Sequence, residues 1–485
     1  MRLRSVFAAA LLSALPACAP HPVPARVPAF KLAPVPAVHA PRWSAADLRS
    51  LQTALRGAFA QTSAVTSGVA IVDADARPLY GVHDRTPLTP ASTFKLLAGI
   101  AVLDTLGPRF RFATDLRAPE APVAGTVNGD LYLVGSGDPT LTAADLRAAA
   151  GALRRAGVAR IDGALIADAS AFAGPEVNPA WDPDDLQYDY GAGQSALDID
   201  GGTVEFHLVP GGVGTSARIE TRPPGGGVVV RGGAITGYTT DLAIQRDPDR
   251  NVFTFTGRIA SGAEQSFFRP VAELPLYAGS VLASRLGERG IALGGGVRLG
   301  VAPLGGVTLW LHRSAPLERI VRDMWVHSDN QYAEHLLRVL GAERGTGTVA
   351  SGARAERALL MRDGVPQAGL RIVDGSGLAA SDRVAPLTLA MLLAHAADGP
   401  AGSTVVRSLP RVGIEGTVRY RVLTDGAGRV RAKSGHITGV NALAGYVQTR
   451  RHGRVAFAFI INGSGADDGP VDAGIDRALD ILARS

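Results

Sequence analysis

The stretch that decides the fold is residues 89–97, Thr-Pro-Ala-Ser-Thr-Phe-Lys-Leu-Leu, which places Ser92 three positions before Lys95. Its proline suits the entry to a helix, and an apolar pattern continues to Leu106 before Gly107-Pro108 ends it. Side chains three positions apart share one face of a helix, so the lysine amine can reach the serine hydroxyl. The pair therefore predicts a serine nucleophile, because a neutral lysine beside it can take the hydroxyl proton.

The scarcity of lysine adds weight to this pair, since Ser-x-x-Lys alone is common on exposed helices. Only three of the 49 lysine and arginine residues are lysines, at positions 31, 95 and 433. Arginine stays protonated and cannot serve as a base, whereas a buried lysine can lose its proton. Lys31 lies in a proline-rich leader, which leaves Lys95 and Lys433 as candidates for acid–base chemistry.

Residues 1–19 have the pattern of a secretory signal, with two early arginines, an apolar run and small residues at the end. The run is about half of the roughly 20 residues that a membrane span needs. The sole cysteine, Cys18, follows Leu15-Pro16-Ala17, which resembles a bacterial lipobox and predicts an N-terminal lipid anchor. Cleavage after Ala19 and soluble export is the alternative. Both place the protein in the periplasm or otherwise outside the cytoplasm, and neither leaves a disulfide.

The rest of the chain changes its composition and its expected secondary structure three times. Residues 20–41 are rich in proline and alanine, which predicts an extended tether. Residues 42–110 combine a helix, a hairpin and the Ser92 helix. Residues 111–300 hold short apolar strands, many glycines and one good helix at 142–156, which predicts one or two inserted β-rich domains. Long helices and clear strands return over residues 301–485.

Two further motifs stand in the last part. Ser328-Asp329-Asn330 interrupts a helical pattern that runs from Leu317 to Leu340. Taken alone, this triplet is better interpreted as a helix N-cap, with Ser328 or Asp329 as the capping residue. Lys433-Ser434-Gly435-His436 precedes two strands, at 441–449 and 454–462.

With Ser-x-x-Lys, Ser-Asp-Asn and Lys-Ser-Gly in this order, the sequence resembles the penicillin-binding proteins and serine β-lactamases. It is most similar to the D-alanyl-D-alanine carboxypeptidase/endopeptidase family often called penicillin-binding protein 4. The second motif begins 233 positions after the end of the first, which fits the large insertion of that family. The resemblance implies an α/β (α+β) fold: a serine β-lactamase/DD-transpeptidase-like domain from 42–110 and 301–485, with an antiparallel sheet flanked by helices and interrupted by the β-rich insertion 111–300. Further family-like stretches lie at 135–141, 190–197, 326–337, 374–384 and 441–446.

The resemblance also implies a role for each motif residue. Ser92 is the nucleophile and Lys95 its base, neutral beside a second cation. Ser328 relays the proton to the leaving group, Asn330 orients the substrate amide and Lys433 adds positive charge. Backbone N–H groups of Ser92 and His436 form the oxyanion hole. The expected substrate-binding residues are Asp329, Ser434, Gly435 and His436. Ser434 replaces the usual threonine, and His436 stands where a small hydroxyl residue is usual.

The implied function is a serine D-alanyl-D-alanine carboxypeptidase or endopeptidase that acts on peptidoglycan stem peptides and is inhibited by β-lactams. A β-lactamase or esterase of the same fold, and a non-catalytic peptidoglycan or β-lactam sensor, remain alternatives.

No cofactor, metal or nucleic-acid partner is expected, since zinc and phosphate-loop motifs are absent and the arginines are scattered. His207, His327 and His335 have no partner at metal spacing and are interpreted as surface or capping residues.

Overall fold

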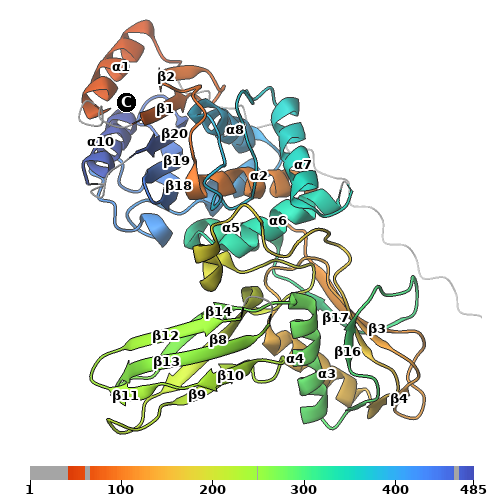
Figure 1. The fold of residues 1–485 in the computed structure, drawn as a ribbon. Helices are drawn as coiled ribbons and strands as arrows, with labels where there is room; N and C mark the ends of the chain where they lie inside the picture. Colours follow the sequence, from red (N-terminus) through yellow and green to blue (C-terminus); the bar gives the residue numbers. More distant parts are fainter. Residues whose placement is uncertain (1–41, 60–65, 248–249, 344, 464–468) are drawn as a thin grey trace, which may run out of the picture. The chain divides into compact units, whose positions relative to one another are not determined.

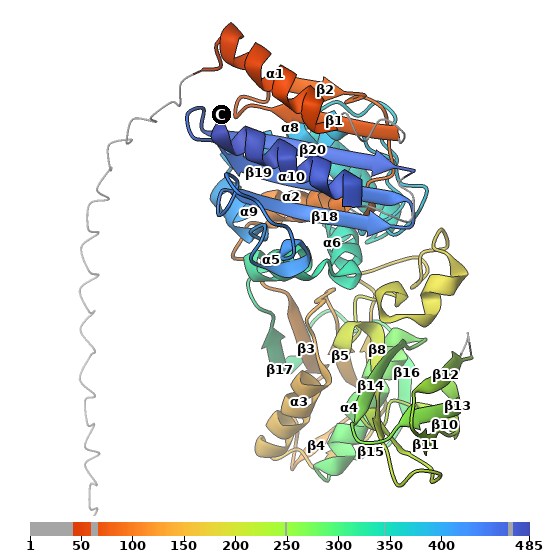
Figure 2. The ribbon, with the colours of Figure 1, turned by 90° about the vertical axis from the view of Figure 1, so that its left-hand side faces the viewer.

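The motifs are organised around a five-stranded antiparallel sheet in a computed structural model that describes residues 42–59, 66–247, 250–343, 345–463 and 469–485. The strand order is β18-β19-β20-β1-β2 (Figures 1 and 2). β1 pairs with β20 from Thr66↔Asn462 to Val72↔Ala456, so residues far apart in the sequence lie side by side. The predicted hairpins are confirmed. The strands are β1 (Thr66–Val72), β2 (Pro78–Val82), β18 (Val430–Ile437), β19 (Val440–Gln448) and β20 (Arg454–Asn462).

Alternate residues of this sheet enter two different apolar cores, as the two-residue period of a strand requires. Ala70 and Val72 pack against helices α2 and α8 on one face, and Val69 and Ile71 pack against α1 and α10 on the other. Figure 2 shows α1 and α10 in front of the sheet and α2 and α8 behind it. The sheet is therefore buried on both faces, which holds its edge strand β18 rigidly.

Ten α-helices occur among the described residues. The helices predicted near 45–59, 142–156, 385–397 and 471–483 are confirmed within a few residues. Their bounds are α1 (Ala45–Phe59), α2 (Lys95–Leu106), α3 (Ala143–Arg155), α4 (Leu274–Glu288), α5 (Leu317–His327), α6 (Asn330–Ala342), α7 (Val349–Arg362), α8 (Pro386–Asp398), α9 (Gly402–Ser408) and α10 (Gly469–Arg484).

Two long helices were not expected from the sequence, and both contain glycine. Helix α4 begins with Leu274-Pro275 and carries Gly279, where a Cβ would lie 2.6 Å from a Val297 methyl. Helix α7 contains Gly352, where a Cβ would lie 2.0 Å from the Leu337 carbonyl oxygen of α6. These glycines allow each helix to pack closely against the neighbouring element.

Between β2 and α5 the described residues form four further sheets. Their orders are β16-β7-β5-β3-β17, β15-β6-β4, β14-β8-β9 and β10-β13-β11 with β12 also on β13. The predicted domain limits stay a prediction; β17, just beyond residue 300, pairs with β3. The strands are β3 (Ala113–Ala118), β4 (Thr126–Val127), β5 (Leu131–Val134), β6 (Arg160–Ile161), β7 (Leu165–Asp168), β8 (Thr203–Val209), β9 (Arg218–Arg222), β10 (Val229–Gly232), β11 (Ile235–Gly237), β12 (Asp241–Arg246), β13 (Val252–Ala260), β14 (Gln265–Pro270), β15 (Ala292–Leu293), β16 (Val297–Leu299) and β17 (Val307–Arg313).

The predicted signal, the tether and Cys18 lie outside the described residues. Among the residues that are described, we find no helix with the length and apolar character needed to cross a membrane.

Candidate active site

Ser92 lies on a 3-10 turn, η2 (Ala91–Phe94), directly before α2, and not on the α-helix that the sequence predicted. Ala91, the first residue of this turn, has a φ of 46°. Side chains at i and i+3 eclipse in a 3-10 turn, which brings Ser92 and Lys95 together more closely than an α-helix does. Lys95 Nζ lies 2.8 Å from Ser92 Oγ, so the predicted contact is present.

Lys95 is fully buried and makes three hydrogen bonds. Besides Ser92 Oγ, its Nζ donates to Asn330 Oδ1 at 2.7 Å and to the Ser376 carbonyl oxygen at 2.7 Å. Burial lowers the pKa of Lys95 to about 8, against the opposing charges of Asp374, Glu334 and Asp329. Desolvation disfavours the charged amine, so the side chain is poised to exchange a proton near neutral pH.

The Ser328-Asp329-Asn330 turn divides its residues between structure and site. Ser328 ends α5 in a left-handed conformation, with a φ of 61°. Asp329 caps α6, because its carboxylate accepts a hydrogen bond from the Tyr332 N–H at 3.0 Å. The capping interpretation is therefore correct for Asp329, while Asn330 reaches Lys95 and Ser328 reaches Lys433.

Lys433 lies on β18 and is also fully buried. Its Nζ donates to Ser328 Oγ at 2.9 Å and to the Ser434 carbonyl oxygen at 2.6 Å. Burial, and then the charge of Lys95, lower the pKa of Lys433 well below its ordinary value. The two lysines thus hold two serine hydroxyls, one each, within the same buried site.

Strand β18 packs directly on the Ser92 turn through Gly435. A Cβ at this position would lie 2.7 Å from the Pro90 carbonyl oxygen, 2.9 Å from the Thr93 nitrogen and 3.0 Å from the Ser92 nitrogen. Only glycine permits this approach, which places the next residue, His436, at the mouth of the site. Ser434 Oγ lies 2.6 Å from Thr417 Oγ1 on a neighbouring turn.

A cleft of about 750 Å³ opens over the serine. The residues of the Ser92 turn and of β18 form one side, and residues 180–190 form the other. Asn330 Nδ2 donates to the Tyr190 carbonyl oxygen at 3.0 Å, so this segment is tied to the site itself. The cleft is lined by Ser92, Ala180, Trp181, Asp182, Pro183, Asp185, Tyr190, Asn330, Gly377, Leu378, Ala380, His436, Ile437 and Thr438.

Sequence reasoning did not assign the turn that holds the far side of Lys95. Asp374 accepts hydrogen bonds from the Gly377 and Ala379 N–H groups and from Trp181 Nε1. Glu334 accepts from the Gly375 and Ser376 N–H groups, which aims the Ser376 carbonyl at Lys95. The family-like stretch 374–384 was the available signal, but it carries no nucleophile and no base.

Two histidines lie in other surroundings than expected. His335 is fully buried between the Gln331 carbonyl oxygen at 2.8 Å and Asp198 Oδ2 at 2.9 Å, and it links α6 to the segment before β8. His207 is also buried and contacts Glu264 at 2.9 Å. Within the residues that the structure covers, no three His, Cys, Asp or Glu side chains gather as metal ligands.

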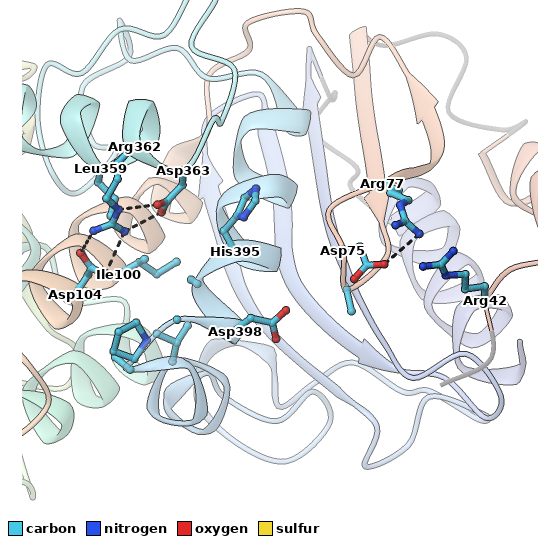
Figure 3. A pocket seen from close by; sticks show the side chains of 16 residues that line it. Arg42, Asp75, Arg77, Ile100, Asp104, Leu359, Arg362, Asp363, His395 and Asp398 are labelled. Carbon is cyan, nitrogen blue, oxygen red and sulfur yellow. Dashed lines mark hydrogen bonds and ion pairs between the residues drawn. The ribbon is translucent and has the colours of Figure 1, made fainter. Parts of the chain in front are cut away.

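A second large cavity, of about 770 Å³, lies at the other end of α2 (Figure 3). Its wall includes Asp104 at the end of α2, together with His395 of α8. Arg362 pairs there with Asp104 and Asp363. None of the three sequence motifs lines this cavity. We therefore assign it no part in the chemistry, although it is large.

The sheet with helices on both faces and two buried lysines, each holding one serine hydroxyl, define a serine acyl-transfer enzyme of the DD-peptidase and serine β-lactamase class. The chain belongs to the D-Ala-D-Ala carboxypeptidase 3 (S13) family, whose model matches residues 51–484. A D-alanyl-D-alanine carboxypeptidase of an Actinomadura species is 34% identical over 434 residues, 85% of this chain and 80% of that protein. Carboxypeptidase DacB of Mycolicibacterium smegmatis is 31% identical, covering 86% of this chain and 81% of that protein.

Among solved structures, penicillin binding protein 4 of Haemophilus influenzae superposes with a TM-score of 0.77 at 24% identity. The match covers 88% of this chain and 99% of that one. These comparisons confirm the predicted family, the fold class and the activity class of a serine D-alanyl-D-alanine carboxypeptidase. They give no support to the β-lactamase, esterase or sensor alternatives.

Proposed function

We propose that this chain cleaves the terminal D-alanine from peptidoglycan stem peptides through an acyl-enzyme on Ser92. The observation that carries the proposal is the buried Lys95 amine, 2.8 Å from the Ser92 hydroxyl and with a pKa near 8. A hydroxyl next to such an amine is activated by losing its proton as it attacks.

In the first step Ser92 Oγ attacks the carbonyl carbon of the penultimate D-alanine, and the hydroxyl proton passes to Lys95. The oxyanion is stabilised by the backbone N–H groups of Ser92 and His436, which Gly435 brings close to one another. Preorganised donors of this kind contribute several kcal/mol to a transition state. Because the contribution at position 436 comes from the main chain, histidine can supply it.

In the second step the C–N bond breaks and the D-alanine amine takes a proton. It is the proton that Lys95 accepted from Ser92, and Ser328, whose hydroxyl contacts Lys433 at 2.9 Å, relays it to the amine. Water then attacks the ester carbonyl and gives a proton to Lys95, the ester C–O bond breaks, and Ser92 Oγ takes the proton back from Lys95. Asn330 orients the peptide amide, while Asp329 holds Asn330 at the start of α6. Ser434, Gly435 and His436 line the substrate along β18.

DD-endopeptidase action is a second candidate, and one feature favours it. A cavity of about 300 Å³ adjoins Ser328 and Asn330 and is lined by Tyr190 and Phe268 among others. A cross-linked peptide has a larger leaving group than D-alanine, and this cavity offers room for it. β-Lactams, which carry a strained amide and a carboxylate, would acylate the same serine.

The proposed place of action is the cell wall outside the cytoplasm. It is supported by the secretory pattern of residues 1–19. A lipid on Cys18 would anchor the chain, with residues 20–41 as the tether. Metabolic labelling with a fatty-acid probe tests the anchor, and an unlabelled mature protein that starts near residue 20 would exclude it.

Release of D-alanine from an acyl-D-Ala-D-Ala peptide, measured beside the hydrolysis of benzylpenicillin, tests the reaction. We expect catalytic release of D-alanine, whereas benzylpenicillin forms an adduct that turns over slowly. Rapid penicillin hydrolysis without an accumulating adduct would identify a β-lactamase instead. Absence of both activities would favour the sensor.

A further inference from the structure

Thr417 makes a contact with the site that the proposed mechanism does not use. Its Oγ1 lies 2.6 Å from Ser434 Oγ, although both side chains are accessible to water that could satisfy them singly. Ser434 follows Lys433 on β18, and Lys433 in turn contacts Ser328. The two hydroxyls therefore lie beside the part of the active site that holds the Lys433 amine.

The turn that carries Thr417 is fixed on both sides. Thr417 belongs to the 3-10 turn η6 (Gly416–Val418), and Val418 is buried. A Cβ on Gly416 would lie 2.4 Å from the Val326 carbonyl oxygen, so the turn packs against the end of α5 that leads to Ser328. Glu415 directly precedes this turn, and its carboxylate accepts hydrogen bonds from Arg322 of α5 and from the Arg411 N–H.

We propose that Thr417 and Ser434 together bind the terminal carboxylate of the substrate, which makes Thr417 a specificity-determining residue. The inference rests on the proposed function, in which Ser434 lines the substrate along β18, and it gives the Ser434 and Thr417 hydroxyls a shared role in binding the substrate carboxylate. In the free protein one hydroxyl of the pair donates to the other, so one O–H donor is left over. On arrival of a carboxylate the pair separates, and each hydroxyl donates to one carboxylate oxygen.

Charge favours this exchange. A hydrogen bond to a carboxylate is stronger than one between two neutral hydroxyls, roughly twofold in energy. A bound carboxylate also opposes the burial that lowers the pKa of Lys433, because a negative charge favours the ammonium form. Loss of one such hydrogen bond should reduce recognition of a carboxylate on the order of 10-fold.

The test compares acylation by benzylpenicillin with acylation by its methyl ester, which lacks the carboxylate. The proteins are the wild type, Thr417→Val, Thr417→Ser and, as a matched control on the same loop, Thr424→Val. Valine keeps the shape of threonine and removes only the hydroxyl. We expect Thr417→Val to lose about 10-fold with the free acid and little with the ester, while Thr417→Ser and Thr424→Val keep the wild-type ratio.

The ratio of the two rates within each protein separates recognition from structural damage. An acid-to-ester ratio of acylation rates in Thr417→Val equal to that of the wild type would overturn the inference, whether or not both rates fall. A wild-type protein that neither compound acylates would contradict the proposed function itself, and this inference with it. Thermal melting of each variant verifies the fold.

Discussion

The two buried lysines face different charges. Lys95 lies near the carboxylates of Asp374, Glu334 and Asp329, which favour its protonated form. Lys433 has no such carboxylate, and the charge of Lys95 adds to its burial. Burial therefore lowers the pKa of both lysines, and nearby carboxylates oppose this effect at Lys95.

Exchange of each lysine for arginine separates their roles. In Lys95→Arg a guanidinium cannot accept the proton and crowds Ser92, so we expect acylation by penicillin to fall on the order of 100- to 10,000-fold. Lys433→Arg keeps a positive charge and should lose less. The second-order rate of acylation measures both, with thermal melting as the control. Equal and mild losses in the two variants would show that Lys95 is not the base.

The pH dependence of acylation follows from the same lysine. The pKa of Lys95 is lowered to about 8, so about one molecule in ten holds a neutral amine at pH 7. The reactive form is the deprotonated one, so the rate should rise as the pH increases through 8 and level off above 9. Stopped-flow acylation between pH 6 and pH 10 measures this profile. A flat profile would show that no group with this pKa controls the attack.

At the scale of elements, the site depends on the contact between β18 and the Ser92 turn. The sheet is packed on both faces, so β18 cannot move away from the turn without disturbing either core. On the other side of α2, Trp325 of α5 covers Gly99 and donates to the Lys95 carbonyl oxygen at 3.0 Å. The Ser92 turn is thus held between a sheet edge and a helix.

Gly435→Ala tests this contact. The new methyl group would meet the backbone of residues 90–93 at 2.7 to 3.0 Å, so the strand and the turn must separate. Displacements of about 1 Å at a reacting centre cost on the order of 100-fold, and we expect a loss of that size in acylation. Gly57→Ala on α1 is the control, because a Cβ there has open space. Wild-type acylation in Gly435→Ala would contradict the described packing.

Much of this arrangement was predictable from the sequence because it is local. The Ser92–Lys95 pair, the cap formed by Asp329 and the hairpin β19–β20 each depend on neighbours a few positions away. Ser376, Glu334 and Trp181 were not predictable, because their function arises from contacts across more than 40 positions. The 3-10 form of the Ser92 turn was missed as well, since proline and an apolar run favour both helix types.

At the scale of the whole described chain, the region between β2 and α5 contributes directly to the cleft. The Tyr190 carbonyl holds the amide of Asn330, and Trp181 holds Asp374 behind Lys95. His335 and Asp198 add a buried contact between α6 and the same region. Sequence texture identified this region as β-rich, but it gave no sign that segment 180–190 lines the active site.

The central claim is that Ser92 is the nucleophile. Incubation with benzylpenicillin, followed by intact mass and peptide mapping, tests it most directly. The account predicts one adduct per chain, located on Ser92, and no adduct in a folded Ser92→Ala variant. An adduct on Ser328, Ser434 or another residue, or one that persists in Ser92→Ala, would contradict it.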